Sequence, residues 1–272
     1  MTVLEKTKPP SEKVNLSGNN GLRLSWAGSA EEIREIQELR FRLFGLGSGA
    51  GTDVDALDGV FRHLMVRSVD ERLLGCCRLA VFRGPEILDG YTAQYYDLQK
   101  LGHGDMTTLE LGRVCAVPGA HSPDVLRLIF GGVGRVVLEE GAGLLFGCSS
   151  FAGTDPDPLR PAFGWLAAGH LAPESWRPGI KAAEHVMLHP DLFQASPSTT
   201  PSGVPPILRY YLMMGGRVSD HAVIDRRLNT THVFTGVMVN DIPTARRRVL
   251  TNLADSVGTR FAIPVDLPRG PR

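Results

Sequence analysis

Two charged side chains stand inside a run of residues that otherwise reads as a buried β-strand. The run is TTLELGRVCAV, residues 107–117, and it carries Glu110 and Arg113 among apolar neighbours. Charged side chains are rarely buried unless they are paired or functional. A buried carboxylate can take a proton from an amine, and a guanidinium can bind a carboxylate through two parallel hydrogen bonds. The run therefore predicts either acid–base chemistry or a buried ion pair that only fixes the strand.

The three-residue spacing adds a geometric condition. Side chains alternate along a regular strand, so Glu110 and Arg113 would point to opposite faces. A β-bulge between them would bring both side chains to one side. Arg113 would then either pair with Glu110 or hold the carboxylate of a substrate, and the sequence leaves both alternatives open.

A third buried charge is expected in the apolar run GCCRLAV, residues 75–81, which contains Arg78. A buried guanidinium without a partner is too costly to expect. Its candidate partners are Asp58, Glu110 or a substrate. Asp55 and Asp58 could hold an ammonium group of a substrate, or they could equally cap a turn or helix.

The hydrophobic pattern predicts the elements that position these residues. Ser29 and Glu32 have the spacing of a capping box, which starts a helix. Apolar periodicity then predicts, in chain order, a helix up to residue 44, a hairpin of residues 63–67 and 73–82, a strand over 107–117, a helix over 123–140 and strands from 143, over 222–224 and over 233–239. The strand–helix–strand unit around residues 107–150 favours parallel pairing, so the fold class is α+β with a mixed sheet.

Composition limits the classes of function. The formal net charge is zero, so no global field favours nucleic acid. No apolar run reaches the 18 residues or so that would span a bilayer, the first residues lack a secretory signal, and the four cysteines lack metal-binding spacing. We expect a cytoplasmic protein with no metal, divided into a flexible tail over 1–21, a domain over 22–245 and a basic, proline-containing tail over 246–272.

Eight segments in order resemble the ornithine-lipid-type N-acyltransferases of the GNAT-like superfamily, which also resemble acyl-homoserine-lactone synthases. The segments are LRFRLF (39–44), DALDGVFRHLMV (55–66), GCCRLAV (75–81), GYTAQYYDLQKL (90–101), LELGRVCAV (109–117), LFGCSSFAG (145–153), PPILRYYLMMGGRV (205–218) and AVIDRRLNTTHVF (222–234). The resemblance implies a GNAT-like mixed central sheet with a splayed parallel strand pair, flanked by helices. Such a splay favours the bulge described above.

The resemblance also implies an enzyme that transfers a (3-hydroxy)acyl chain from acyl carrier protein to the α-amine of an amino acid, forming a lyso-aminolipid. It makes Glu110 the general base, with Arg113 beside it. The substrate-binding residues that it implies are Arg40, Phe44, Asp55, Asp58, His63, Arg78, Ser150 and Phe151. For Arg40 and Phe44, one turn apart on the first helix, a solvated arginine and a core phenylalanine are the alternative.

Four positions depart from the family pattern: Ser219, His221, Leu228 and His232. The family tends to have glycine at the first two, an aromatic residue at the third and aspartate at the last. These departures leave the acceptor more open than the reaction. Ornithine is the expected amino acid, with glutamine or another as the alternative.

The donor can be inferred from the segment after the central strand, VPGAHSPDV, residues 117–125. CoA-dependent acetyltransferases place a glycine-rich loop here, whose backbone N–H groups hold pyrophosphate. Two prolines, which lack N–H groups, make this segment a poor cradle. It favours acyl-phosphopantetheine on acyl carrier protein as donor, with no bound cofactor.

Acyl carrier proteins are acidic, so we expect a basic docking patch. Its candidate residues are Arg127, Arg135, Arg246, Arg247 and Arg248. For the arginine triplet, a solvated tail or contact with anionic lipid headgroups is the alternative, which would put the protein at the inner face of the membrane by peripheral contact.

Three rival functions are a lactone synthase, a CoA-dependent N-acetyltransferase and a non-catalytic acyl-carrier or lipid-binding module. Lactone synthases usually carry a tryptophan shortly after the phenylalanine of the first helix. Residues 45–60 contain no tryptophan, which counts against the lactone synthase.

Overall fold

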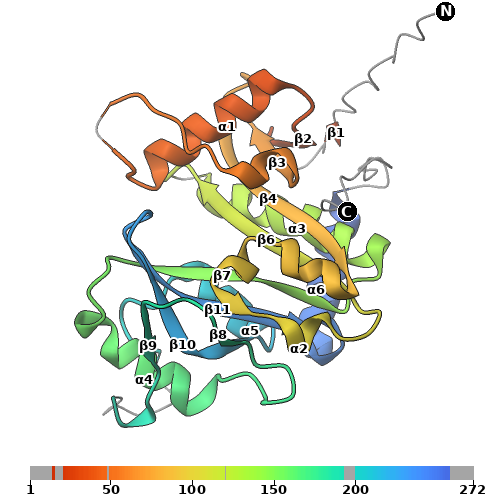
Figure 1. Ribbon diagram of the computed structural model, residues 1–272. Coiled ribbons are helices and arrows are strands. Elements are labelled where there is room, and N and C mark those ends of the chain that lie inside the picture. The colour runs from red at the N-terminus through yellow and green to blue at the C-terminus, as the bar shows by residue number, and fades with distance from the viewer. Residues whose placement is uncertain (1–13, 16–20, 48, 120, 193–199, 258–272) are drawn as a thin grey trace, which may run out of the picture.

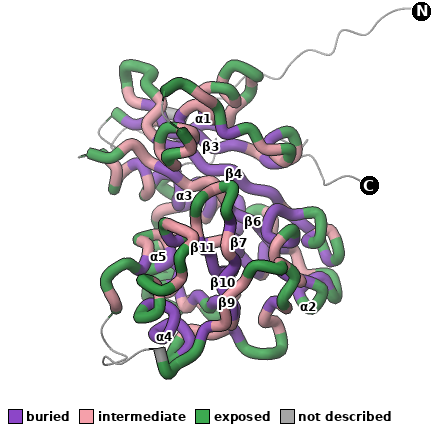
Figure 2. The backbone as a smooth tube through the Cα atoms, turned by 60° about the vertical axis from the view of Figure 1, so that its left-hand side comes forward, coloured by how far each residue is buried: buried purple, intermediate pink, exposed green. Residues whose placement is uncertain are grey.

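A long mixed sheet forms the centre of the protein. The computed structural model describes residues 14–15, 21–47, 49–119, 121–192 and 200–257, and within them nine strands pair in the order β1-β2-β3-β4-β6-β7-β11-β10-β9 (Figure 1). Their bounds are β1 Val14–Asn15, β2 Arg23–Trp26, β3 Arg62–Arg67, β4 Leu73–Arg83, β6 Thr107–Ala116, β7 Leu144–Ala152, β9 His185–Met187, β10 Arg217–Asp225 and β11 Thr230–Met238. Strands β5 Tyr96–Asp97 and β8 Gly179–Ile180 form a separate pair. Figure 2 shows that the central strands are the most buried part of the chain.

Helices cover both faces of this sheet. They are α1 Ala30–Leu43, α2 Gln99–Gly102, α3 Ser122–Glu140, α4 Arg160–Gly169, α5 Pro206–Met213 and α6 Thr244–Ser256. Helix α3 packs on β3, β4 and β6, and α6 packs on α3. The α+β class and the mixed, helix-flanked sheet are therefore confirmed. None of the described helices is long and apolar enough to cross a bilayer.

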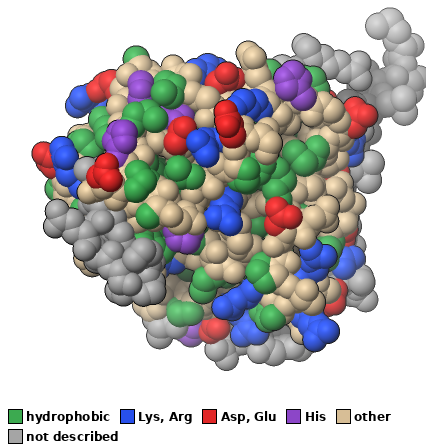
Figure 3. Space-filling view, turned by 90° about the horizontal axis from the view of Figure 1, so that it is seen from below, with side chains coloured by type: hydrophobic (Ala, Val, Ile, Leu, Met, Phe, Trp, Pro, Cys, Tyr) green, Lys and Arg blue, Asp and Glu red, His purple; other side chains and the backbone are tan. Residues whose placement is uncertain are grey.

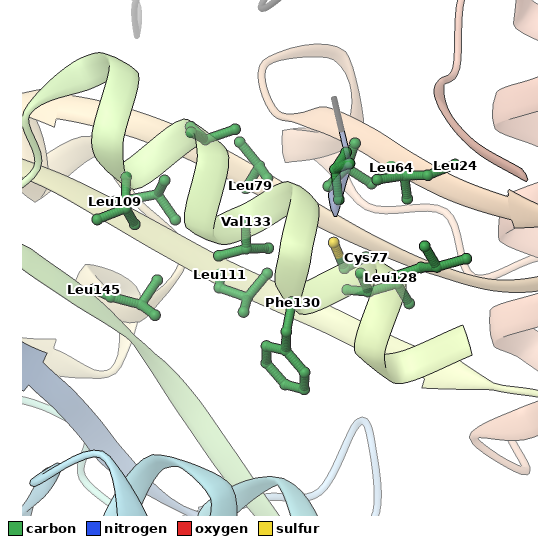
Figure 4. Close-up of a cluster of buried hydrophobic side chains, with 14 of the residues drawn as sticks. Leu24, Leu64, Cys77, Leu79, Leu109, Leu111, Leu128, Phe130, Val133 and Leu145 are labelled. Carbon is green, nitrogen blue, oxygen red and sulfur yellow. The ribbon is translucent and has the colours of Figure 1, made fainter. Parts of the chain in front are cut away.

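The expected β6–α3–β7 unit is present. Leu79, Leu109 and Leu111 of the strands point toward Leu128 and Val133 of α3 (Figure 4). The burial of this apolar stripe holds α3 to the sheet. The helix ends at Glu140, where Gly141 adopts the left-handed conformation that closes many helices.

The capping expected at the first helix is confirmed at Ser29, whose hydroxyl accepts a hydrogen bond from the Glu32 N–H at 3.1 Å. This bond satisfies a backbone donor that the first turn of a helix leaves free. The Glu32 carboxylate accepts from the Gly28 N–H at 2.7 Å, one residue before the Ser29 N–H that a capping box would use. The two bonds fix the start of α1, whose last turn carries Arg40.

Strands β6 and β7 separate partway along their length. Their parallel pairing begins at Thr108 and ends where Glu110 lies beside Phe146, although both strands continue for several residues (Figure 1). Gly147 lies at this point, and a Cβ there would be 2.2 Å from the Leu111 carbonyl oxygen. Only glycine therefore allows the strands to come this close before they diverge. The expected splay is confirmed.

The expected bulge lies on β6 just beyond the splay. The register between β4 and β6 shifts between Cys76 and Arg78, and Arg113 has a φ of 53°. A left-handed conformation is uncommon for arginine. The bulge turns the Arg113 side chain toward the side on which Glu110 lies.

The packed part of the chain extends past both expected boundaries. In the tail expected over 1–21, Val14–Asn15 pairs with β2 as strand β1, while residues 1–13 and 16–20 lie outside the described residues. The boundary expected at residue 245 falls inside α6, whose Ala254 is buried, and Val257 just after it is buried as well. The arginine triplet made this segment read as a tail, but its apolar positions recur at helical spacing and pack on α3. Residues 258–272 are outside the described residues.

Candidate active site

A cavity of about 320 Å³ opens where β6 and β7 separate. Its walls include Leu111 and Tyr211, from the core beneath α3, and Phe61 and Tyr91, from the core on the opposite face of the sheet. The cavity therefore reaches both faces of the sheet through the gap between the strands. The described residues that line it are Phe44, Phe61, Arg78, Tyr91, Glu110, Leu111, Gly112, Arg113, Val114, Cys148, Ser150, Phe151, Ala152, Ile207, Tyr211, Leu228, Thr230 and His232.

Glu110 lies at the point of the splay and is 1% exposed. One carboxylate oxygen, Oε2, accepts from the Tyr91 N–H at 3.0 Å. The other, Oε1, accepts from the Thr92 N–H at 2.6 Å and from the Thr92 hydroxyl. A carboxylate has about four lone-pair positions, so three are filled and one on Oε2 is left.

Burial raises the pKa of Glu110, although the hydrogen bonds from Thr92 and Tyr91 and the charge of Arg78 oppose that shift. A carboxylate with a raised pKa binds a proton more readily than an exposed glutamate does. The position can therefore accept a proton from a group held in the cavity.

Gly90 allows this arrangement because a Cβ at residue 90 would be 2.3 Å from Oε2 of Glu110. Its backbone, with φ −74° and ψ 168°, suits any residue, so the restriction is contact alone. We expect Gly90→Ala to displace the carboxylate and to lower the rate of a reaction that depends on Glu110 by about a hundredfold, as a misplacement of about 1 Å can. Steady-state kinetics checks this, with Gly169→Ala as control because nothing lies within 4 Å of its Cβ. Wild-type turnover in Gly90→Ala would contradict the assigned contact.

A buried network of alternating charges lies beside the cavity. Its members are three arginines and three aspartates: Arg40, Arg78, Arg113, Asp53, Asp55 and Asp58. Asp58 receives two hydrogen bonds from Arg40, at 3.0 and 2.7 Å, and one from Arg78, at 2.9 Å. Burial alone would raise the pKa of Asp58, but the hydrogen bonds and charge of Arg40, with Gln37 and Arg78, hold that pKa well below its usual range. The six charges balance, which allows their burial.

Three comparisons with known proteins bear on this site. A family model described as an acetyltransferase (GNAT) domain matches residues 37–130. An L-ornithine N(alpha)-acyltransferase of Rhodobacter capsulatus is 31% identical over 76% of this chain and 86% of its own length. Another, of Brucella abortus, is 30% identical over 78% of this chain and 83% of its own. The chain belongs to this acyltransferase family.

The protein is therefore an N-acyltransferase. Among solved structures, the match to a CoA-dependent acyl-homoserine lactone synthase covers 84% of this chain and 83% of that protein's chain, with 14% identity and a TM-score of 0.44. The match to an N-acyl amino acid synthase from uncultured soil microbes covers 85% of this chain and 94% of that protein's chain, with 10% identity and a TM-score of 0.42.

In the acyltransferase, Arg113 shares the cavity with Glu110 but does not pair with it. Arg113 binds Asp53 at 2.9 Å and Asp55 at 3.2 Å. Of the partners expected for Arg78, Asp58 is confirmed, and Asp55 is a second. The guanidinium carbons of Arg78 and Arg113 lie 5.3 and 5.2 Å from the centre of the Tyr91 ring. The acyltransferase therefore holds both cations in the cavity wall by charge pairs and by an aromatic face.

Three expected substrate-binding residues lie away from the cavity. Arg40 is fully buried and bound to Asp53 and Asp58, so neither substrate contact nor the solvated alternative describes it. His63 is 2% exposed and its Nε2 lies 3.1 Å from the Asp58 carbonyl oxygen, while burial lowers its pKa to about 4. Asp58 has both carboxylate oxygens bonded to arginines. These three residues lie outside the cavity of the acyltransferase and contact its wall through the bond from Arg78 to Asp58.

The other candidates divide between the cavity and the charge network beside it. Phe44, Ser150 and Phe151 line the cavity as expected. Asp55 caps the 3-10 helix Ala56–Gly59, which was the alternative to ammonium binding, and also joins the charge network.

The arginines expected to dock a carrier protein lie on the neighbouring helices α3 and α6 of the acyltransferase. Arg127, Arg246 and Arg248 are exposed, Arg135 pairs with Glu139, and Arg247 donates to the Val239 and Asn240 carbonyl oxygens at 3.1 and 2.8 Å. On the face shown in Figure 3, basic and acidic side chains are interspersed.

Sequence reasoning missed several residues of the site. Tyr91 and Thr92 hold Glu110, and Asp53 joins the charge network. Tyr91 and Thr92 stand in GYTAQYYDLQKL, which contributed to the resemblance but received no role. His232 was noted only as a departure, although two-residue alternation along β11 places it on the same face as the buried Phe234.

Proposed function

We propose that this N-acyltransferase joins a fatty acyl chain to the α-amine of an amino acid, with Glu110 as the general base. The observation that carries the proposal is the buried Glu110 carboxylate, which has one free lone pair and faces a cavity at the splay of two parallel strands. The resulting product is an N-acyl amino acid, a lyso-aminolipid.

The proposed reaction needs a neutral amine. An α-amino group has a pKa of roughly 8, so most of it carries a proton at pH 7. Glu110 accepts that proton through Oε2, and the neutral amine nitrogen then attacks the thioester carbonyl. The C–N bond forms and the C–S bond breaks. A second proton from the nitrogen passes to the leaving sulfur, which departs as the thiol of the phosphopantetheine arm, and Glu110 releases its proton to solvent. Arg78 and Arg113 supply positive potential for the carboxylate of the acceptor.

The start of α3 supports a donor without pyrophosphate. The Ser122 N–H donates to the Gly119 carbonyl oxygen at 3.1 Å, and Pro123 has no N–H. Asp124 adds a negative charge in the first turn. This helix start therefore offers an anion much less than a glycine-rich helix N-terminus does. We propose acyl-phosphopantetheine of acyl carrier protein as the donor, with no bound cofactor.

A groove of about 860 Å³ supports the entry path for that donor. It is lined by residues of α3, α5 and α6 and shares Val114 and Ile207 with the cavity. The exposed Arg127 stands in its wall. We propose that the arm enters along this groove and that Arg127, Arg246 and Arg248 attract the acidic carrier protein.

The acceptor and the location of the enzyme belong to the same proposal. The relatives are named for L-ornithine, which makes ornithine the first acceptor to test, followed by glutamine. The product would carry a fatty chain. We therefore propose that the enzyme works in the cytoplasm, by peripheral contact with the inner face of the membrane.

We expect the purified protein to form an amide when it is incubated with 3-hydroxyacyl carrier protein and an amino acid. Mass spectrometry identifies the product. The same acyl group on CoA should react more slowly, and the rate with the carrier protein should fall as salt screens the docking charges. Product from acyl-CoA alone would select the acetyltransferase alternative, and no product from either donor would reject the proposed function.

A further inference from the structure

His232 stands in the wall of the same cavity as Glu110. It lies on β11 directly opposite Ser150 of β7, and it is 2% exposed. The ring is held by two aromatic neighbours, with Tyr95 edge-on at 4.9 Å and Tyr96 at 5.7 Å between ring centres. The imidazole is therefore a fixed part of the wall.

The hydrogen bonds of Tyr96 determine which imidazole nitrogen carries the proton. The Tyr96 hydroxyl donates to the His232 carbonyl oxygen at 2.8 Å and lies 3.2 Å from Nδ1 of the same residue. A phenol has a single proton, so the Tyr96 oxygen must accept from an Nδ1–H group. Nε2 is then the nitrogen with a free lone pair.

Nε2 of His232 is buried and has no hydrogen-bond partner among the described residues. Burial and the charge of His221 lower the pKa of His232 to about 4, against the opposing charge of Asp225, so the ring is neutral at pH 7. A buried acceptor without a partner is unfavourable until a ligand satisfies it. His232 therefore contributes to the cavity wall a neutral acceptor that has no partner among the described residues.

The charges that line the cavity disfavour a cationic partner for Nε2. Among the described residues that line the cavity, Glu110 carries the one carboxylate, and three donors already hold it. Asp225 lies nearby but does not line the cavity, and its oxygens accept from the Tyr95 hydroxyl at 3.2 Å and the Leu228 N–H at 3.1 Å. A side-chain ammonium buried here would find no carboxylate in the cavity wall other than Glu110, the proposed base, which makes its burial costly.

We infer that His232 selects the acceptor amino acid by accepting a hydrogen bond from an uncharged N–H donor at the end of its side chain, the chemistry of a primary carboxamide. The inference rests on the proposed function and narrows the acceptor to the class of glutamine. A side chain that ends in ammonium, as in ornithine, is then the poorer substrate.

The test compares kcat/KM for glutamine, ornithine and norvaline with one 3-hydroxyacyl carrier protein as donor. Wild type should prefer glutamine to ornithine by about tenfold or more, and His232→Leu should lower the value for glutamine by about tenfold while leaving norvaline nearly unchanged, since only glutamine loses a buried hydrogen bond. His232→Gln, which keeps an acceptor near Nε2, should retain the preference. His232→Asp, which adds a carboxylate, should shift the preference toward ornithine. His189→Gln, an exposed position, is the control.

Three outcomes would overturn the inference. In the first, wild type prefers ornithine. In the second, His232→Leu lowers kcat/KM equally for all three acceptors, which would indicate a structural role for His232. In the third, the same variant changes only the ratio of the rates with 3-hydroxyacyl and unsubstituted acyl donors, which would show that Nε2 binds the acyl hydroxyl instead. If no amino acid is acylated by any variant or by wild type, the proposed function itself fails.

Discussion

Glu110→Gln is expected to lower the rate of amide formation by about 10²- to 10⁴-fold, the usual contribution of a general base. Glutamine fills the same space as Glu110 but cannot take the proton of the amine. One of its terminal atoms becomes an N–H₂ donor facing Tyr91 or Thr92, which both donate to Glu110. We therefore expect some loss of stability as well as of activity. Steady-state kinetics with carrier-protein donor measures the rate.

Two controls separate loss of the base from loss of the fold. Binding of acyl carrier protein to Glu110→Gln should stay close to wild type, because the groove that we assign to the arm does not include residue 110. Glu139→Gln, at an exposed position on α3, should leave the rate unchanged. Wild-type product formation by Glu110→Gln would reject the base assignment.

Asp58→Ala is expected to lower the free energy of unfolding by about 3–5 kcal/mol, the usual effect of removing one partner from a buried ion pair. The variant leaves Arg40, which is fully buried, with Asp53 as its one remaining carboxylate partner in the network, and it removes a contact of Arg78. Chemical denaturation at pH 7 measures the change. Asp157→Ala is the matched control, because Asp157 pairs with Arg160 at an exposed site, where such pairs contribute about 0–1 kcal/mol. Equal losses in the two variants would show that the network does not stabilise the fold.

The same network has a pH dependence with a definite sign. The folded-state pKa of Asp58 lies below that of an unfolded aspartate. Its stabilising contribution is therefore fully present above about pH 4 and is lost as the pH falls further toward the folded pKa. Asp58→Ala should remove this part of the acid sensitivity.

Local patterns were enough to predict most of the central fold. The Ser29 helix cap, the β3–β4 hairpin and the β6–α3–β7 unit are each encoded by residues close together in the chain. The apolar alternation on β6 also singled out Glu110, because a charge in a buried strand breaks the pattern. These features depend on local periodicity, which a sequence displays directly.

Contacts between distant residues could not be predicted in the same way. Pairing with Glu110 was one of the two alternatives predicted for Arg113, yet Arg113 binds Asp53, which is 60 positions away in the chain. That choice depends on the bulge and on how α1 and the loop after it pack against β4, and no local pattern specifies either. Arg40 read as a solvated or substrate-binding residue because its partners, Asp53 and Asp58, lie 13 and 18 positions further along the chain. His232 needed the position of Tyr96 to reveal its free nitrogen.

The pH dependence of single-turnover amide formation tests the role of Glu110 most directly. With acyl carrier protein bound and the amino acid saturating, chemistry alone limits the rate. Since burial raises the pKa of Glu110, the wild-type rate should fall on the acid side at a pH above the ordinary glutamate range. Glu110→Gln should be slow and should lack that acid limb. A wild-type rate and an unchanged acid limb in Glu110→Gln would contradict the mechanism.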